Sequence, residues 1–148
     1  MPITISKPFL ELVRQYTSQN SYEFILAYIS YCHAIDDLVD GDKTDAKYII
    51  QCFNFAAVLY SSQYYRDHQE QLFPLIMSAG LSYVQSVEYE RSKVPWKLKF
   101  ADSLRSEANN VLIFIVNNES GYEKALEFSE KLREFSYKEH HTEEGVMI

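Results

Sequence analysis

The segment from Tyr22 to Asp40 constrains the fold more than any other part of this sequence. Its apolar side chains recur every three or four residues, which is the period of an α-helix. The expected inner face carries Tyr22, Ile25, Leu26, Ile29, His33, Asp36, Asp37 and Asp40. A second apolar stripe leaves only four residues for the solvent side, namely Glu23, Ala27, Ser30 and Ala34. We therefore expect a long helix that is largely buried and whose inner face ends in carboxylates.

Composition and periodicity extend the helical prediction along the whole chain. The 148 residues are 47% hydrophobic, which suffices for one core, and only four glycines and four prolines leave little room for the turns of a sheet. Helix starts are indicated by Pro74, by Pro95 and by the capping-box pattern of Ser120 to Glu123. The expected helices lie at about residues 18–40, 45–62, 74–90, 96–117 and 122–137, after a short turn at 9–16. We predict an all-α single domain over residues 1–148, a bundle of about five main helices with frayed ends at 1–8 and 139–148.

Four carboxylates close the long helix, at Asp36, Asp37, Asp40 and Asp42. Carboxylates that face inward are costly unless a cation compensates them. Asp36 and Asp40 stand one helical turn apart, so they could chelate Mg²⁺ or Mn²⁺ with Asp37 alongside. In the alternative interpretation the helix ends at Gly41 and the acids lie in solvent, although negative charge is unfavourable at a helix C-terminus. Both interpretations stay open at this point.

Other residues could complete a metal and phosphate site. Glu90 lies at the flank of the apolar face expected for residues 74–90, which makes it a candidate fourth carboxylate. A metal-bound phosphate also needs fixed cations, and the candidates are Arg66, Arg91 and Arg105. His33 precedes the acids by one turn, so it is either a ligand or proton shuttle or an ordinary core histidine.

The run from Tyr31 to Gly41 resembles the first aspartate-rich motif of the phytoene and squalene synthases. Those all-α enzymes bind prenyl diphosphates through magnesium. The resemblance implies that Asp36, Asp37 and Asp40 are magnesium ligands that bridge to a diphosphate. This sequence has no second DxxxD motif. Its nearest substitute is Asp102, Ser106 and Asn110, and we expect Asp102 and Ser106 on the exposed side of their helix.

A longer stretch is similar to a family of small helical proteins, often encoded by bacteriophages, that carry a DDLIDGD-like motif. The similarity spans about residues 30–115. After the aspartates it includes Phe53 and Asn54, His68 with Leu72, Pro74 and Leu75, Glu90 to Ser92, and Leu104 to Ser106. The resemblance implies a short self-contained protein, and it implies no particular activity.

Charge and cysteine content narrow the classes of function. A net charge of −7 disfavours binding to nucleic-acid phosphates but would attract a basic protein. The longest apolar run, Val111 to Val116, is too short to span a bilayer, and we expect no leader peptide at the N-terminus. Cys32 and Cys52 form no CxxC motif, which is typical of a protein of the reducing cytoplasm.

Two functions of different class follow from these observations. The first is metal-dependent binding or turnover of a phosphorylated or diphosphate metabolite at the aspartate motif, by metal-activated hydrolysis or by prenyl transfer. The second is a non-catalytic, phage-associated interaction protein that acts on a host or phage protein through an acidic, tyrosine-rich surface. The 12 tyrosines also agree with a homodimer.

Overall fold

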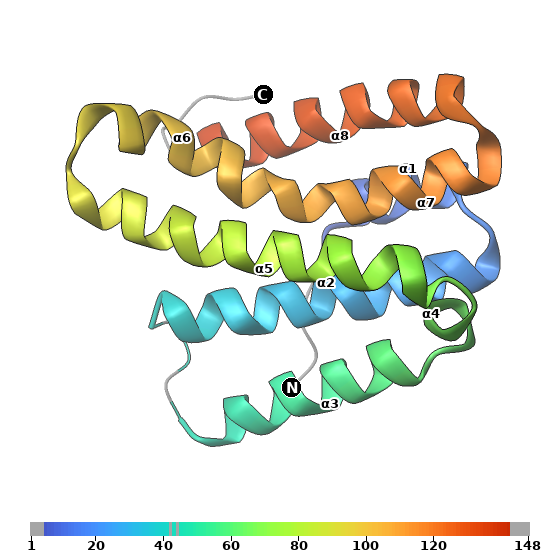
Figure 1. The fold of residues 1–148 in the computed structure, drawn as a ribbon, viewed down its shortest axis with the longest axis horizontal. Helices are drawn as coiled ribbons and strands as arrows, with labels where there is room; N and C mark the ends of the chain where they lie inside the picture. The colour runs from blue at the N-terminus through green and yellow to red at the C-terminus, as the bar shows by residue number, and fades with distance from the viewer. Residues whose placement is uncertain (1–4, 42, 44, 143–148) are drawn as a thin grey trace. The chain divides into compact units, whose positions relative to one another are not determined.

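The computed structural model describes residues 5–41, 43 and 45–142, and every regular element in these ranges is a helix (Figure 1). The prediction of an all-α fold is thereby confirmed. The helices group into two compact units, residues 1–68 and 69–148. Within the described ranges, none of the helices combines the length and apolar character that crossing a membrane requires.

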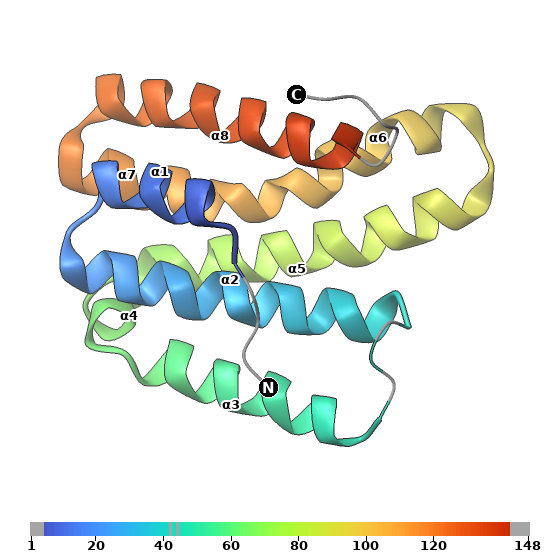
Figure 2. The ribbon, with the colours of Figure 1, turned by 180° about the vertical axis from the view of Figure 1, so that it is seen from behind.

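The described residues of the first unit form four helices. They are α1 (Lys7–Tyr16), α2 (Gln19–Val39), α3 (Lys47–Ser61) and α4 (Gln63–Asp67). The hydroxyls of Ser6 and Ser18 accept hydrogen bonds from the backbone N–H groups of Phe9 and Ser21, so serines cap the starts of α1 and α2. Helix α3 runs back beside α2, as Figures 1 and 2 show from opposite sides.

Aromatic side chains fill the core of this unit. The ring of Phe24 lies 5.4 Å from that of Tyr64 and 6.4 Å from that of Tyr65, and Tyr65 meets Tyr60 edge to face at 5.0 Å. These contacts fix α4 against α2 and α3. The buried tyrosines of the unit are Tyr16, Tyr22, Tyr28, Tyr64 and Tyr65. Much of the tyrosine content therefore serves the core.

The second unit consists of two helical hairpins. Its elements are α5 (Gln69–Ser92), α6 (Pro95–Ser106), the 3₁₀ turn η1 (Glu107–Asn109), α7 (Asn110–Ser120) and α8 (Tyr122–Thr142). Helix α6 packs on α5, and α8 packs on α7 (Figures 1 and 2). The α7–α8 hairpin buries Val111, Leu112, Ile115, Val116, Ala125, Phe128 and Leu132.

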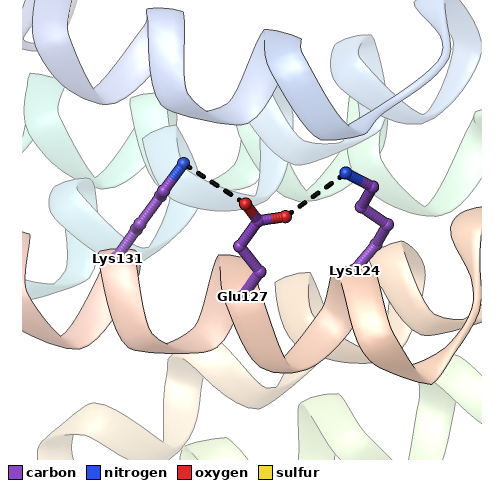
Figure 3. Close-up of polar contacts among 3 residues, drawn as sticks. All are labelled: Lys124, Glu127 and Lys131. Carbon is purple, nitrogen blue, oxygen red and sulfur yellow. Dashed lines mark hydrogen bonds and ion pairs between the residues drawn. The ribbon is translucent and has the colours of Figure 1, made fainter.

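The outer face of α8 carries a series of charged side chains. Figure 3 shows Glu127 between two lysines, with its carboxylate 3.4 Å from Lys124 Nζ and 3.8 Å from Lys131 Nζ. One turn further on, Lys138 Nζ lies 2.8 Å from Glu134 Oε1. Charged pairs at i, i+3 and i, i+4 are typical of a helix face in contact with water.

Two helix boundaries and one residue before a helix differ from the sequence prediction. Helix α5 begins at Gln69, so Pro74 lies inside it rather than at its start. The expected helix 96–117 is interrupted by η1, where the Ser82 hydroxyl of α5 donates a hydrogen bond to Glu107. Ser120 is the last residue of α7 and Gly121 makes the turn with φ 89°, so Gly121 rather than Ser120 directly precedes α8, which begins at Tyr122 as expected. The break at η1 involves a side-chain contact with another helix, and a local sequence pattern cannot predict such a contact.

Candidate functional site

The aspartate motif occupies the C-terminal end of α2. Asp36 and Asp37 belong to the last turn, and Asp40 is the C-cap residue, whose N–H donates to the Asp36 carbonyl at 2.8 Å. Gly41 follows with φ 77°, the left-handed conformation that commonly ends helices. Asp36 and Asp37 are half-buried and Asp40 is exposed, while Asp42 lies outside the described residues. The helix end at Gly41 agrees with the alternative interpretation, but of the three described acids only Asp40 lies in solvent as that interpretation expects.

A lysine lies beside the motif. Lys43 Nζ is 3.2 Å from Asp37 Oδ2, and the Lys43 backbone N–H also donates to the Asp37 carbonyl at 3.4 Å. The Lys43 ammonium lies 5.6 Å from the centre of the Tyr48 ring, which helps to hold it there. Burial, together with the Asp37 carboxylate, also raises the pKa of Cys52 on α3. The ammonium group of Lys43 therefore supplies part of the positive charge that the carboxylates need.

The rotation of α2 differs from the expected one in its C-terminal half. His33 is exposed, whereas Ala34, which was expected on the solvent side, is only 4% exposed. The expected inner face is correct for Tyr22, Ile25 and Ile29, which are buried. The error arises because apolar residues surround this helix, so periodicity alone could not choose its outer side. With His33 on the outside, the core-histidine interpretation is wrong.

Glu90 and Arg105 form a different constellation in the second unit. Arg105 Nη2 lies 2.9 Å from Glu90 Oε1, and its guanidinium carbon lies 5.8 Å from the centre of the Tyr83 ring. The ion pair joins α6 to α5, which is a structural role. Arg91 is exposed near the C-terminal end of α5.

The remaining residues of the predicted site lie on helix surfaces. In the first unit, Arg66 is exposed on α4 and donates to the Gln63 side chain at 3.3 Å. Asp102 and Ser106 are exposed as expected. Asn110 is exposed as well, and η1 separates it from the other two. Among the residues that the structure describes, no three His, Cys, Asp or Glu side chains form a group that could hold a metal ion.

The second unit has a surface feature that the sequence analysis did not identify. Along one side of α5, four large apolar side chains are between 49% and 69% exposed, namely Phe73, Met77, Leu81 and Val84. We call these four residues the α5 stripe. Gly80 lies within it, and a Cβ atom built on Gly80 would meet no other atom within 4 Å. The stripe is therefore an open apolar surface with a side-chain-free position near its centre.

The expected start of a helix at Pro74 concealed this pattern. With the helix beginning at Gln69, the residues Phe73, Met77, Gly80 and Val84 follow a 4-3-4 spacing, which places them on one side of a continuous helix. From the sequence, Val84 shares the apolar face expected for residues 74–90 with Ile76 and Ala79, but it is 56% exposed. A comparison of the chain with protein-family models, curated proteins and solved structures finds no match.

Proposed function

We propose that the protein is a non-catalytic interaction protein that binds an apolar helix of a partner protein along the α5 stripe. The observation that carries this proposal is Gly80. Glycine inside a helix costs about 1 kcal/mol relative to alanine, and its lack of a Cβ atom lets another backbone approach closely. Nothing in the described residues fills the space beside Gly80. A partner helix crossing at this point would use that space for close approach.

The side chains around Gly80 fit the same kind of partner. Phe73, Met77 and Val84 flank it at helical spacing, as in grooves that accept an amphipathic helix. Methionine adapts to partners of different shape because it is unbranched and polarisable. A contiguous apolar surface of this kind is uncommon on proteins that act alone.

The charges on α5 indicate which kind of helix the partner would present. Glu70 and Glu88 are exposed on the same side of α5, before and after the stripe, and Arg91 follows Glu88 by one turn. With a net charge of −7, the chain would attract a helix that has basic residues near its ends. Glu70 and Glu88 are 18 positions apart, which corresponds to about 27 Å along a helix. The proposed ligand is thus an amphipathic helix with an apolar centre and basic ends.

Site-specific photo-crosslinking tests this proposal. A photoreactive amino acid at position 81 should give an adduct with one protein in cells that express the chain. The same amino acid at the exposed Leu126 of α8 is the matched control and should not. The captured protein is then purified, and calorimetry should show that Leu81→Lys abolishes its binding while Leu126→Lys does not. Equal adducts at both positions, or unchanged affinity of Leu81→Lys, would contradict the proposal.

The aspartate motif supports a second candidate function, the binding of a divalent cation. Three acids at the C-terminal end of α2 face the negative end of the helix dipole, which favours a cation there. Asp36 and Asp40 would supply two carboxylates, and water or phosphate oxygens would complete the coordination that magnesium prefers. Calorimetry with MgCl₂ or MnCl₂ tests this candidate. Equally weak binding by the wild type and by an Asp36→Asn, Asp40→Asn double variant would exclude it.

A further inference from the structure

Positive charge is concentrated at the turn that joins α5 to α6 (Figures 1 and 2). Residues 91–100 contain no acid and four of the chain's 14 basic residues, namely Arg91, Lys93, Lys97 and Lys99. Within the part of the chain that the structure describes, none of these three lysines belongs to an ion pair, whereas Lys124 and Lys131 of α8 share Glu127 (Figure 3). The turn is therefore a local basic surface on an acidic chain.

The stability of α6 does not explain its lysines. Lys97 lies in the first turn of α6, where the helix dipole disfavours positive charge. That turn contains no acidic residue, and the N-cap residue Val94 makes no side-chain cap. Arg91 and Lys93 differ, because they adjoin the C-terminal end of α5, where the dipole favours them. The charge at the start of α6 thus destabilises the isolated chain, and a negatively charged partner would offset that effect.

Exposed aromatic side chains lie among these lysines. Trp96 is 54% exposed and Phe100 is 56% exposed. The centre of the Trp96 ring lies 5.5 Å from that of Tyr89 and 6.2 Å from that of Phe100. The Lys97 ammonium lies over both Tyr89 and Trp96, 5.5 Å and 5.6 Å from the ring centres. We call this surface the basic–aromatic patch, and its residues are Tyr89, Lys93, Trp96, Lys97, Lys99 and Phe100.

We propose that the basic–aromatic patch binds the surface of a membrane that contains anionic phospholipids. Tryptophan and tyrosine favour the headgroup level of a bilayer, where an apolar ring and a polar group are both accommodated. Phe100 would enter more deeply, and so would Leu98, which is 44% exposed at the same end of α6. The lysine side chains are long enough to reach lipid phosphates from beside these rings.

The net charge of −7 does not prevent this contact, because salt screens charges that are more than about 8 Å away. Of the acids nearest in sequence, Glu90 is paired with Arg105 at 2.9 Å. Asp102 is exposed two residues after Phe100, which places it on a different side of α6. Glu88 is exposed beside Tyr89, and it is the one acid that adjoins the patch without such a separation or a printed ion pair. The lysines therefore dominate the charge that this surface presents.

The ring geometry favours lipid over single-stranded nucleic acid. Bases bind by lying flat on aromatic rings. In the patch, the ammonium of Lys97 lies over the rings of Tyr89 and Trp96, where a base would stack. Neighbouring ring planes also meet at 78° and 80°, so they do not form one continuous platform. A bilayer requires only that apolar and basic side chains share one surface, and the patch meets this requirement.

Fluorescence tests the proposal directly, because Trp96 is the only tryptophan of the chain. Vesicles of equal parts phosphatidylglycerol and phosphatidylcholine should shift its emission to shorter wavelength, and co-sedimentation should give the partition coefficient. Lys97→Gln/Lys99→Gln should lower that coefficient about 25-fold, since each lysine near an anionic surface contributes about fivefold. Lys124→Gln/Lys131→Gln changes the net charge equally and should leave the coefficient unchanged.

Further controls separate binding from folding. Circular dichroism should show unchanged helix content in each variant, and Phe100→Ser, which alters no charge, should also weaken binding. The proposal would be overturned by an unshifted emission, by equal weakening in the two double variants, or by a larger shift with single-stranded oligonucleotides than with vesicles. None of these substitutions touches the α5 stripe, so the proposed function is tested separately.

Discussion

The guanidinium group of Arg105 lies 2.9 Å from the carboxylate of Glu90, and this ion pair joins α6 to α5. Arg105 also packs on the ring of Tyr83, so its long side chain contributes through contact as well as through charge. Both residues were candidates for a phosphate-metal site. Their mutual contact gives each of them a structural role that can be measured without any ligand.

The first prediction concerns this pair. Arg105→Ala should lower the free energy of unfolding by about 1 kcal/mol, because it removes a partly exposed ion pair together with packing on Tyr83. Glu90→Gln should cost less, about 0.5 kcal/mol, because the packing remains. Urea unfolding measures both, and Lys124→Ala, at the exposed pair on α8, is the control that should change stability by less than about 0.5 kcal/mol. A larger loss for Glu90→Gln than for Arg105→Ala would contradict this account.

The second prediction compares one substitution at two glycines. Gly80→Ala should stabilise the protein by about 1 kcal/mol, since the added methyl group meets open space and alanine is the better helix former. Gly41→Ala should destabilise it by a similar amount, because φ 77° is strained for any residue with a Cβ atom. Thermal unfolding of the two variants should shift in opposite directions. Shifts of the same sign would show that one of the two backbone environments is wrongly described.

The third prediction concerns the acids of α2. Asp40→Asn should raise the free energy of unfolding by about 0.5 kcal/mol, because it removes negative charge from the C-terminal end of the helix dipole. The gain should shrink in 1 M salt, where such interactions are screened. If a divalent cation is bound there instead, the same substitution should reduce the stabilisation that added MgCl₂ produces. Urea unfolding with and without MgCl₂ distinguishes these outcomes.

The fourth prediction concerns pH. Burial raises the pKa of Cys32 from 9.0 to about 11 despite an opposing hydrogen bond with Tyr28, and the Asp36 carboxylate adds to the increase. The folded state therefore holds the thiol proton more tightly than the unfolded state does. Its contribution to stability is complete below pH 9 and is lost as the pH rises toward 11, on the order of 2 kcal/mol. Cys32→Ala should make the free energy of unfolding fall less steeply over this range, and an unchanged slope would refute the assignment.

The sequence predicts the helical class and several helix bounds because these depend on local pattern. Helix α2 ends within one residue of the expected Asp40, and α3 lies within the expected range 45–62. The break at η1 depends on contacts between helices, such as the hydrogen bond from Asn109 to Ser136, 27 positions away. No local periodicity contains that information.

The candidate site was less accessible from sequence. The aspartate motif is conspicuous, yet its partner Lys43 lies beyond the helix end, where periodicity makes no prediction. The α5 stripe was missed because Pro74 was assigned to a helix start, which excluded Phe73 from the helix. The openness beside Gly80 is a property of the packed chain, so composition could not reveal it.

The most direct test of the central claim combines stability and binding for Gly80→Ala. The partner captured at position 81 is titrated into the wild-type protein and into the variant, and the unfolding of both is measured in parallel. We predict that Gly80→Ala unfolds at higher temperature than the wild type but binds the partner at least about tenfold more weakly, a loss of about 1.4 kcal/mol, because the methyl group occupies the space of the partner helix. A variant that is more stable and binds as tightly as the wild type would contradict the claim that this side of α5 is the binding surface.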